Sequence, residues 1–146
     1  MSSANHARLQ VLLVVGHAGV AVLASLFLLT IWPGQWDLVR WAGALLLVVG
    51  MVLVFIARLQ LGMSFSILPR AKKLVTRGLY SKIRNPIYVF STIAIAGMLL
   101  ILRRPGLWLV LAALVGMQIV RARKEAEVLE SKFGDEYRAY RKRTWF

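Results

Sequence analysis

The stretch TRGLYSKIRNPIYVF, residues 76–90, decides how this chain folds because it joins a basic turn directly to an apolar segment. A Gly-x-Tyr turn and an Arg-Asn-Pro-x-Tyr turn follow one another within fifteen residues, and about sixteen apolar residues come next. Pro86 disfavours helical geometry at Asn85 and suits the first turn of a helix. The stretch therefore predicts an ordered turn at the mouth of a membrane-type helix, which a simple connector does not need.

The composition combines apolar and basic residues. The 146 residues are 59% hydrophobic, with a mean hydropathy of +0.67, and carry nineteen Lys and Arg against six Asp and Glu. This balance indicates a membrane protein with one basic face, whereas a nucleic-acid binder would spread basic and aromatic residues over a polar surface. The chain has no cysteine, and its two histidines, His6 and His17, have no carboxylate nearby, so we expect no disulfide and no metal site.

Four apolar segments predict an all-α, polytopic membrane protein with about four transmembrane helices in a single domain, 1–146. The segments cover residues 9–32, 38–57, 87–102 and 107–120. The first lacks a cleavage motif and is interpreted as a retained helix rather than a signal peptide. The last two, of sixteen and fourteen residues, are short for about 30 Å of hydrocarbon. They either span it with polar extensions or form a hairpin that does not cross fully.

The distribution of charge predicts the orientation of the chain. Residues 58–85 hold seven Lys or Arg and no acid, and residues 121–146 hold eight more together with five of the six acids. The positive-inside rule places both regions, and with them both termini, in the cytoplasm. Arg103 and Arg104 then lie on the far side as a mild exception. We therefore expect the cytoplasmic loop and the C-terminal tail to meet on one membrane face.

The tail predicts a helix that continues out of the membrane with one apolar stripe, formed by Leu129, Phe133, Tyr137 and Tyr140. Arg121 and Glu125 extend this stripe backwards at the same spacing of four, whereas Glu127 points to nearly the opposite side. Glu125 is therefore the acid expected to face the protein. The alternative interpretation is a surface pair between Arg121 and Glu125, which contributes only a few tenths of a kcal/mol, about 0.2–0.5.

Three segments together carry a resemblance to a known family: RLQLGMSFS (58–66), KLVTRGLYSKIRNPIY (73–88) and KEAEVLESKFGDEYRAY (124–140). In this order they resemble the isoprenylcysteine carboxyl methyltransferase and phospholipid methyltransferase superfamily of integral membrane enzymes, over about residues 45–146. The resemblance implies S-adenosylmethionine as the cofactor, bound where the cytoplasmic loop meets the C-terminal helix. The sequence departs from the family pattern in four places: Leu79 for Pro, Asn85 for His, Phe90 for Gly and Ala126 for Glu.

The resemblance implies a set of cofactor-binding residues: Gly78, Tyr80, Arg84, Asn85, Pro86, Tyr88, Glu125 and Tyr137. The Arg84 guanidinium suits the cofactor's carboxylate, and Glu125 can accept from its ammonium or ribose hydroxyls. Tyr80 and Tyr88 offer ring faces or hydroxyls. Gly78 permits a turn that brings the backbone close to the ligand, and the helix start at Pro86 is expected to present backbone N–H groups to it. Arg121 and Glu125 are the expected catalytic residues.

The implied function is methyl transfer from S-adenosylmethionine to an amphiphilic acceptor at the cytoplasmic face of the membrane, in a bacterial inner membrane. The abundance of arginine and the scarcity of histidine favour O-methylation of a carboxylate, which is already ionised and needs no general base. N-methylation of a phospholipid or another amphiphilic amine, with Glu125, Glu127 or a tyrosine taking the proton, is the alternative. A non-catalytic membrane module with the same fold is a third. The expected partners are the lipid bilayer and the amphiphilic substrate, with no nucleic acid.

Overall fold

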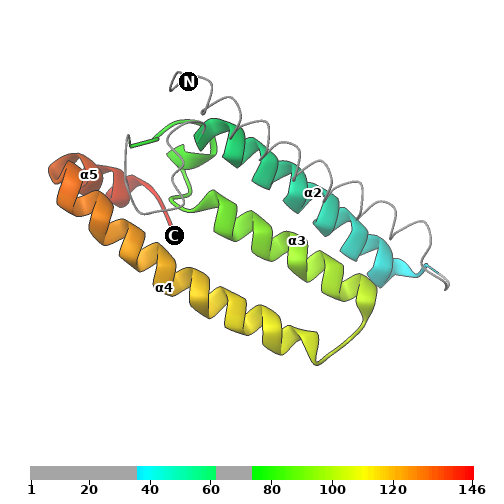
Figure 1. The fold of residues 1–146 in the computed structure, drawn as a ribbon. Coiled ribbons are helices and arrows are strands. Elements are labelled where there is room, and N and C mark those ends of the chain that lie inside the picture. Colours follow the sequence, from blue (N-terminus) through cyan, green and yellow to red (C-terminus); the bar gives the residue numbers. More distant parts are fainter. Residues whose placement is uncertain (1–35, 62–73) are drawn as a thin grey trace, which may run out of the picture.

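The computed structural model of the chain describes residues 36–61 and 74–146. The described elements are α2 (Leu38–Leu61), η2 (Gly78–Ser81), α3 (Pro86–Leu102), α4 (Leu107–Phe133) and α5 (Asp135–Arg143). Figure 1 shows α3 between α2 and α4, with α5 folded back towards the start of α3. The all-helical class is confirmed for this part of the chain, in which no strand forms. The predicted segment at 9–32 and the middle of the predicted loop lie outside the described residues.

The second predicted apolar segment, 38–57, forms a longer helix in the structure, α2. α2 runs for 24 residues and has a mean hydropathy of 2.5 over its most apolar window, so it is long and apolar enough to cross a membrane. α3 is apolar but shorter, with 17 residues. Among the described helices α2 alone meets the length and composition of a span. The topology of four spans therefore stays a prediction.

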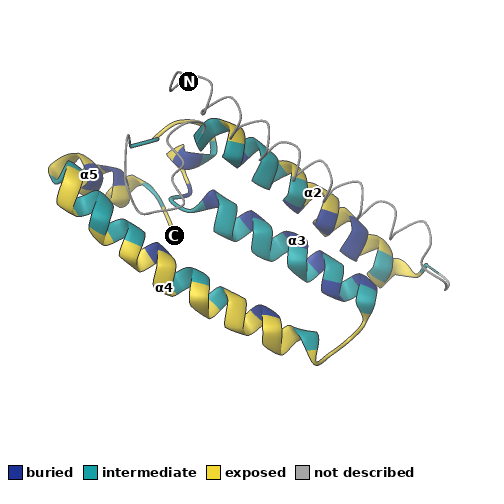
Figure 2. Cartoon of the chain, viewed as in Figure 1, coloured by how far each residue is buried: buried dark blue, intermediate teal, exposed yellow. Residues whose placement is uncertain are grey.

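Glycines bring α2 and α3 into backbone contact. A Cβ on Gly43 would lie 2.7 Å from the carbonyl oxygen of Gly97, and a Cβ on Gly97 would lie 2.5 Å from the amide nitrogen of Leu47. Gly50 meets the backbone of Ala94 in the same way, at 2.7 Å. Such small residues let helices pack closely where lipid removes the hydrophobic drive for association. Ala94 and Ile101 of α3 accordingly form a buried apolar cluster with Ala44 and Leu47 of α2. Figure 2 colours both helices by burial.

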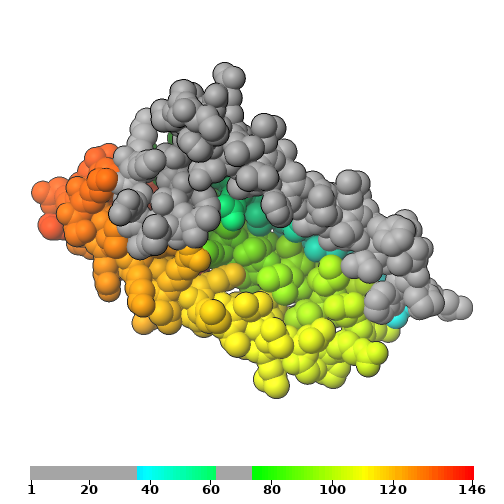
Figure 3. Space-filling model, viewed as in Figure 1, coloured from blue at the N-terminus to red at the C-terminus, as the bar shows by residue number. Residues whose placement is uncertain are grey.

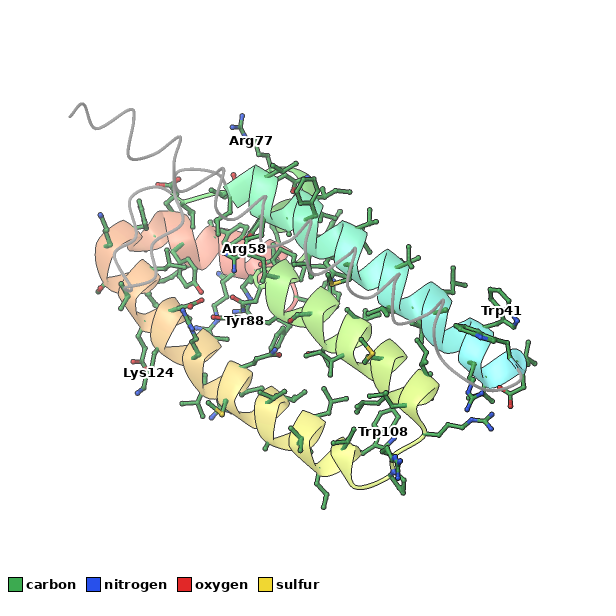
Figure 4. The ribbon with its side chains drawn as sticks, turned by 45° about the vertical axis from the view of Figure 1, so that its right-hand side comes forward. Trp41, Arg58, Arg77, Tyr88, Trp108 and Lys124 are labelled. Atoms are coloured by element: carbon green, nitrogen blue, oxygen red, sulfur yellow. The ribbon has the colours of Figure 1, made fainter. Side chains whose placement is uncertain are left out.

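The end of the bundle away from the loop is held by an ion pair. Asp37 Oδ1 accepts from the N–H of Arg40 at 3.1 Å and so caps the start of α2. Its other oxygen accepts from the Arg103 guanidinium at the end of α3. The charge of Arg103, which is an exception to the predicted orientation, is thus compensated. Trp41 and Trp108 lie at this same end in Figure 4.

The C-terminal half corrects one expectation about where a helix ends. The fourth apolar segment and the first part of the tail form one helix of 27 residues, α4, as the predicted continuation out of the membrane requires. This helix ends at Phe133, and Gly134 after it has φ of +50° and ψ of −120°, a conformation that glycine adopts more readily than other residues. The predicted continuous stripe to Tyr137 and Tyr140 is therefore wrong, because both lie on the separate helix α5.

Candidate functional site

The turn that carries the predicted site is anchored to the end of α2. Gly78 has a φ of +63°, as its predicted turn role requires, and a Cβ here would collide with the side-chain amide of Gln60. The next N–H, of Leu79, donates to Gln60 Oε1 at 2.7 Å. Gln60 is missing from the predicted site residues. The only signal for it is an amide at the end of an apolar helix, which by itself does not indicate a partner.

Two tyrosines from α5 and one from η2 pack together behind this turn. The Tyr140 hydroxyl donates to the carbonyl oxygen of Tyr80 at 2.7 Å, and the rings of Tyr137 and Tyr140 lie 6.2 Å apart. Tyr137 is only 2% exposed. Burial raises the pKa of Tyr140 to about 12 and also raises the pKa of Tyr80. Tyr80 and Tyr140 therefore keep their protons at neutral pH, and the Tyr140 hydroxyl joins α5 to the turn as a donor.

The Arg-Asn-Pro segment starts α3 as predicted. Asn85 has a non-helical φ of −123° and ψ of 61°, and Pro86 occupies the first turn with its side chain fully buried. The two residues before the helix do not offer their N–H groups to a ligand, whereas the expected presentation of N–H groups by the helix start itself stays a prediction. The N–H groups of Arg84 and Asn85 donate to the carbonyl oxygens of Trp145 and Phe146, at 3.1 and 3.0 Å.

Tyr88, Arg121 and Glu125 form a hydrogen-bonded cluster between α3 and α4, which we call the Tyr88 cluster. The Tyr88 hydroxyl donates to Glu125 Oε1 at 2.7 Å, and Arg121 Nε donates to the same oxygen at 3.1 Å. The Glu125 side chain is 33% exposed, whereas Glu127 lies on an exposed face, so the predicted orientation of Glu125 is confirmed. The alternative, a pair between Arg121 and Glu125, is also present, but it does not stand alone because Tyr88 joins it.

Two further arginines come from other elements towards the same end of the bundle. Arg84 Nε is buried and has no hydrogen-bond partner among the described residues. Because a buried donor without a partner is costly, this atom suits an anionic ligand. Arg58, at the end of α2, lies in the same central region as Tyr88, whereas Arg77 and Lys124 extend outwards (Figure 4). The sequence shows Arg58 only as one of several charges after an apolar segment, so it is missing from the predicted site.

The polar contact between α3 and α4 continues one turn further along both helices. Thr92 Oγ1 lies 3.0 Å from Gln118 Oε1 and 2.9 Å from the carbonyl oxygen of Tyr88, so its hydroxyl hydrogen is available to either acceptor. Gln118 Nε2 donates to Ser91 Oγ at 3.4 Å. Most other side chains of α4 are not buried, since Leu111 and Ala122 are the only buried residues of this helix. Figure 3 shows α4, in yellow and orange, along one edge of the visible face. The two helices are therefore joined by polar side chains rather than by a packed apolar core.

Ionisable side chains that pair with one another between apolar helices indicate a functional site in a membrane protein. Residues 38–136 match the family model of phospholipid methyltransferases, and the chain belongs to this family. The match runs from the first residue of α2 into α5, so it includes the turn, the Tyr88 cluster and Arg84. It confirms the resemblance and makes the protein a membrane methyltransferase by family. The chain matches none of the curated proteins with which it was compared.

Proposed function

We propose that this protein transfers a methyl group from S-adenosylmethionine to an amphiphilic acceptor at the cytoplasmic face of a membrane. The observation that carries the proposal is the Tyr88 cluster, which places a carboxylate, a phenol and a guanidinium together at the end of the apolar helices. Membership of a family whose members generally use S-adenosylmethionine supports the choice of cofactor. The family also supports a location in a membrane.

The residues near the Tyr88 cluster fit the groups of S-adenosylmethionine. The buried Arg84 Nε without a partner suits the carboxylate of the cofactor. Glu125 receives both of its hydrogen bonds on Oε1, which leaves Oε2 able to accept from an ammonium or a hydroxyl. Asn85, beside Arg84, can donate or accept through its amide. S-adenosylmethionine, when bound, supplies the methyl group on a sulfonium, and the residues of this chain bind and orient the reactants.

We assign Tyr80 and Tyr137 a packing role in the proposed cofactor site. Both are buried, with exposed fractions of 7% and 2%. They suit the wall of the cofactor site through the edges of their rings rather than through free hydroxyls. Gly78 supports the site by allowing the turn that sets Leu79 against Gln60. Pro86 supports it by starting α3 at a defined residue.

An anionic acceptor, a carboxylate that becomes a methyl ester, suits the charges around the Tyr88 cluster best. Arg58, Arg84 and Arg121 come from three different elements, and Glu125 is the one acid of the cluster. A carboxylate is already ionised at neutral pH, so the chain needs to position it and balance its charge without removing a proton. We propose Arg121, which is 55% exposed in its side chain, as the residue that meets the acceptor.

N-methylation of an amphiphilic amine is the second candidate. It is supported by the description of the family and by Glu125, whose carboxylate lies half-buried where a proton acceptor is needed. In this case Tyr88 and Arg121 hold the carboxylate in place while Oε2 faces the amine. The two candidates differ in the bond formed, and alkali separates them. Labelled methyl esters release methanol in base, whereas labelled N-methyl groups stay on the product.

We place the reaction at the cytoplasmic face of the membrane because of where the basic residues lie. The turn and the tail carry most of the basic residues, and in the fold they meet at one end of the helices. Trp41, Trp108 and the pair of Asp37 with Arg103 lie at the other end. Under the positive-inside rule, the end with the Tyr88 cluster is cytoplasmic in a bacterial inner membrane, with both termini on that side.

Cofactor binding by the purified protein in detergent is the direct test. Wild type should bind S-adenosylmethionine or its demethylated product, and Arg84→Ala should weaken binding by about 2–5 kcal/mol if the charge pair is desolvated. Arg77→Ala is the matched control, because Arg77 lies on the same turn but is exposed. Asn85→His should be tolerated. Calorimetry that finds no binding to wild type at millimolar cofactor would leave only a non-catalytic membrane module.

A further inference from the structure

The last described residues lie along the Arg-Asn-Pro segment as a short parallel pairing. Ile83 and Trp145 form the bridge. The N–H of Trp145 donates to the carbonyl oxygen of Lys82 at 3.0 Å, and the carbonyl oxygens of Trp145 and Phe146 accept from Arg84 and Asn85 at 3.1 and 3.0 Å. We call Trp145 and Phe146 the strap. In Figure 1 the C-terminus accordingly lies beside the start of α3.

The strap holds the main chain on both sides of the Arg84 Cα. The N–H of Arg84 and the N–H of the next residue, Asn85, both donate to it, so neither flanking peptide can rotate without losing a hydrogen bond. The pairing also buries Ile83, which is 9% exposed. The Arg84 side chain leaves this fixed backbone with its Nε buried and without a partner among the described residues.

The strap is itself anchored through α5. The Tyr140 hydroxyl donates to the carbonyl oxygen of Tyr80, and Thr144 Oγ1 donates to the carbonyl oxygen of Tyr140 at 3.0 Å. These bonds tie the helix that leads into the strap to the turn that leads into Arg84. The C-terminal unit and the turn therefore form one hydrogen-bonded structure around the start of α3, although about sixty residues separate Tyr80 from Tyr140 in sequence.

We propose that Trp145 and Phe146 are positioning residues whose main chain holds Arg84 in the orientation in which its guanidinium binds the anionic group of the cofactor. The inference rests on the proposed function. An arginine that is oriented before the ligand arrives loses less conformational freedom on binding, so its pre-orientation increases the affinity for the ligand. The strap acts through its backbone, because the Trp145 side chain is 58% exposed.

The exposed side chain and the hydrogen-bonded backbone of Trp145 allow a matched pair of variants. Trp145→Pro removes the N–H that donates to Lys82 and places the proline ring against that carbonyl oxygen. The preceding residue, Thr144, already has the extended geometry that proline requires, with φ of −123° and ψ of 149°. Trp145→Ala removes the indole and keeps every backbone bond. Trp145→Pro should therefore loosen the hold of the strap on Arg84, whereas Trp145→Ala should leave it unchanged.

Two readouts are expected to change together in Trp145→Pro. The affinity for S-adenosylhomocysteine, measured by calorimetry in detergent, should fall by about tenfold or more, which corresponds to about 1.4 kcal/mol. Amide hydrogen exchange at Arg84 and Asn85, followed by NMR, should become at least about tenfold faster, while amides in the middle of α3 keep their protection. Trp145→Ala should match wild type in both. Unchanged affinity in a folded Trp145→Pro, or equal losses in the two variants, would overturn the proposal.

Tyr140→Phe tests the same idea if Trp145→Pro does not fold. It removes one hydroxyl that anchors α5 and leaves the strap's own atoms in place. Faster exchange at Arg84 with a smaller loss of affinity, about threefold, supports the proposal. A lower melting temperature with unchanged exchange and affinity contradicts it. If wild type binds no cofactor, both the proposed function and the ligand assigned to Arg84 are wrong. Amide exchange at Arg84 in the variants still shows whether the strap holds this residue.

Discussion

The two helix interfaces of this bundle are built in different ways. α2 and α3 meet through Gly43, Gly50 and Gly97, whose missing side chains allow backbone contact. α3 and α4 meet through the Tyr88 cluster and the contact between Thr92 and Gln118. In lipid, close packing of small residues and interhelical hydrogen bonds are the two available sources of attraction. The first interface uses packing and the second uses polar groups, so close packing and the proposed chemistry lie at different interfaces.

The difference has a consequence for the position of the site. Five of the six buried residues of α3, at 86, 90, 94, 97 and 101, lie on one side of the helix, and Leu99 lies on the other. This other side carries Tyr88 and Thr92, which reach α4. α3 is thus fixed to α2 by its backbone while it presents hydroxyl groups to α4. A helix holds the side chains that it carries more accurately than a loop does.

Substitution at the packed interface should have the largest effect on stability. Gly97→Ala places a Cβ 2.5 Å from the backbone of both Gly43 and Leu47, neither of which can move aside cheaply. We expect a loss of about 1–3 kcal/mol in the free energy of unfolding, measured by denaturation in mixed micelles. Gly116→Ala is the control, because a Cβ there meets nothing within 4 Å. It should be neutral or stabilise the helix by up to about 1 kcal/mol. Effects of equal size and sign in the two variants would show that close packing at Gly97 contributes nothing beyond helix propensity.

At the polar interface, Glu125→Gln should affect function and leave stability nearly unchanged. The substitution keeps the shape of the side chain and its acceptor oxygen but removes the charge that faces Arg121. Cofactor affinity or turnover should fall by about tenfold or more, equivalent to about 1.4 kcal/mol. The melting temperature should change little, since an exposed pair contributes well under about 1 kcal/mol.

Glu127→Gln is the internal control for the orientation of this helix. Glu127 lies two residues further along α4 and is exposed, so its substitution should be close to neutral in both measurements. A loss as large as that of Glu125→Gln would contradict the assignment of Glu125 to the site. The same result would also reduce the contrast between the two interfaces, because charge anywhere on α4 would then matter.

A smaller effect is expected one turn deeper between α3 and α4. Thr92→Val keeps the volume of the side chain but removes the hydroxyl near Gln118 Oε1. Interhelical hydrogen bonds of this kind contribute about 0.6 kcal/mol on average in membrane proteins. The melting temperature in detergent should therefore fall slightly, with no change for Thr76→Val on the exposed turn. A loss of several kcal/mol would mean that this contact, rather than the glycines, holds the bundle together.

The smallest effect concerns the ion pair at the far end of both interfaces. The backbone N–H of Arg40 is the main cause that lowers the pKa of Asp37 below its usual 3.8, and the Arg103 guanidinium adds to it. A lowered pKa in the folded state means that this stabilisation is present above about pH 3.8 and is lost as the pH falls through the folded value. Asp37→Asn keeps the cap and removes the charge, so its melting temperature should vary less between pH 5 and pH 3, about the range in which Asp titrates. Identical pH profiles would show that the pair contributes nothing.

Local sequence patterns determined a definite part of this protein. The proline at residue 86 predicts the start of α3 because its ring suits the first helical turn and excludes helical geometry at Asn85. Glu125 faces the protein because residues four apart share one face of a helix, and Arg121 and Glu125 belong to the single helix α4. These predictions depend only on neighbours in the chain. The family motifs extended them to a cofactor and a reaction, but not to an acceptor.

Tertiary structure decided the contacts between elements, which the periodicity of the sequence does not predict. Gly134 ends α4, so Tyr137 and Tyr140 continue the predicted spacing on a different helix, where they pack against the turn. The docking of Trp145 beside Ile83 joins parts of the chain far apart in sequence through backbone atoms, which every residue has and no motif marks. The positions of Arg58 and Gln60 depend in the same way on how α2 meets the turn. A pattern in sequence reports the faces of one element, whereas contacts between elements depend on where the chain turns back.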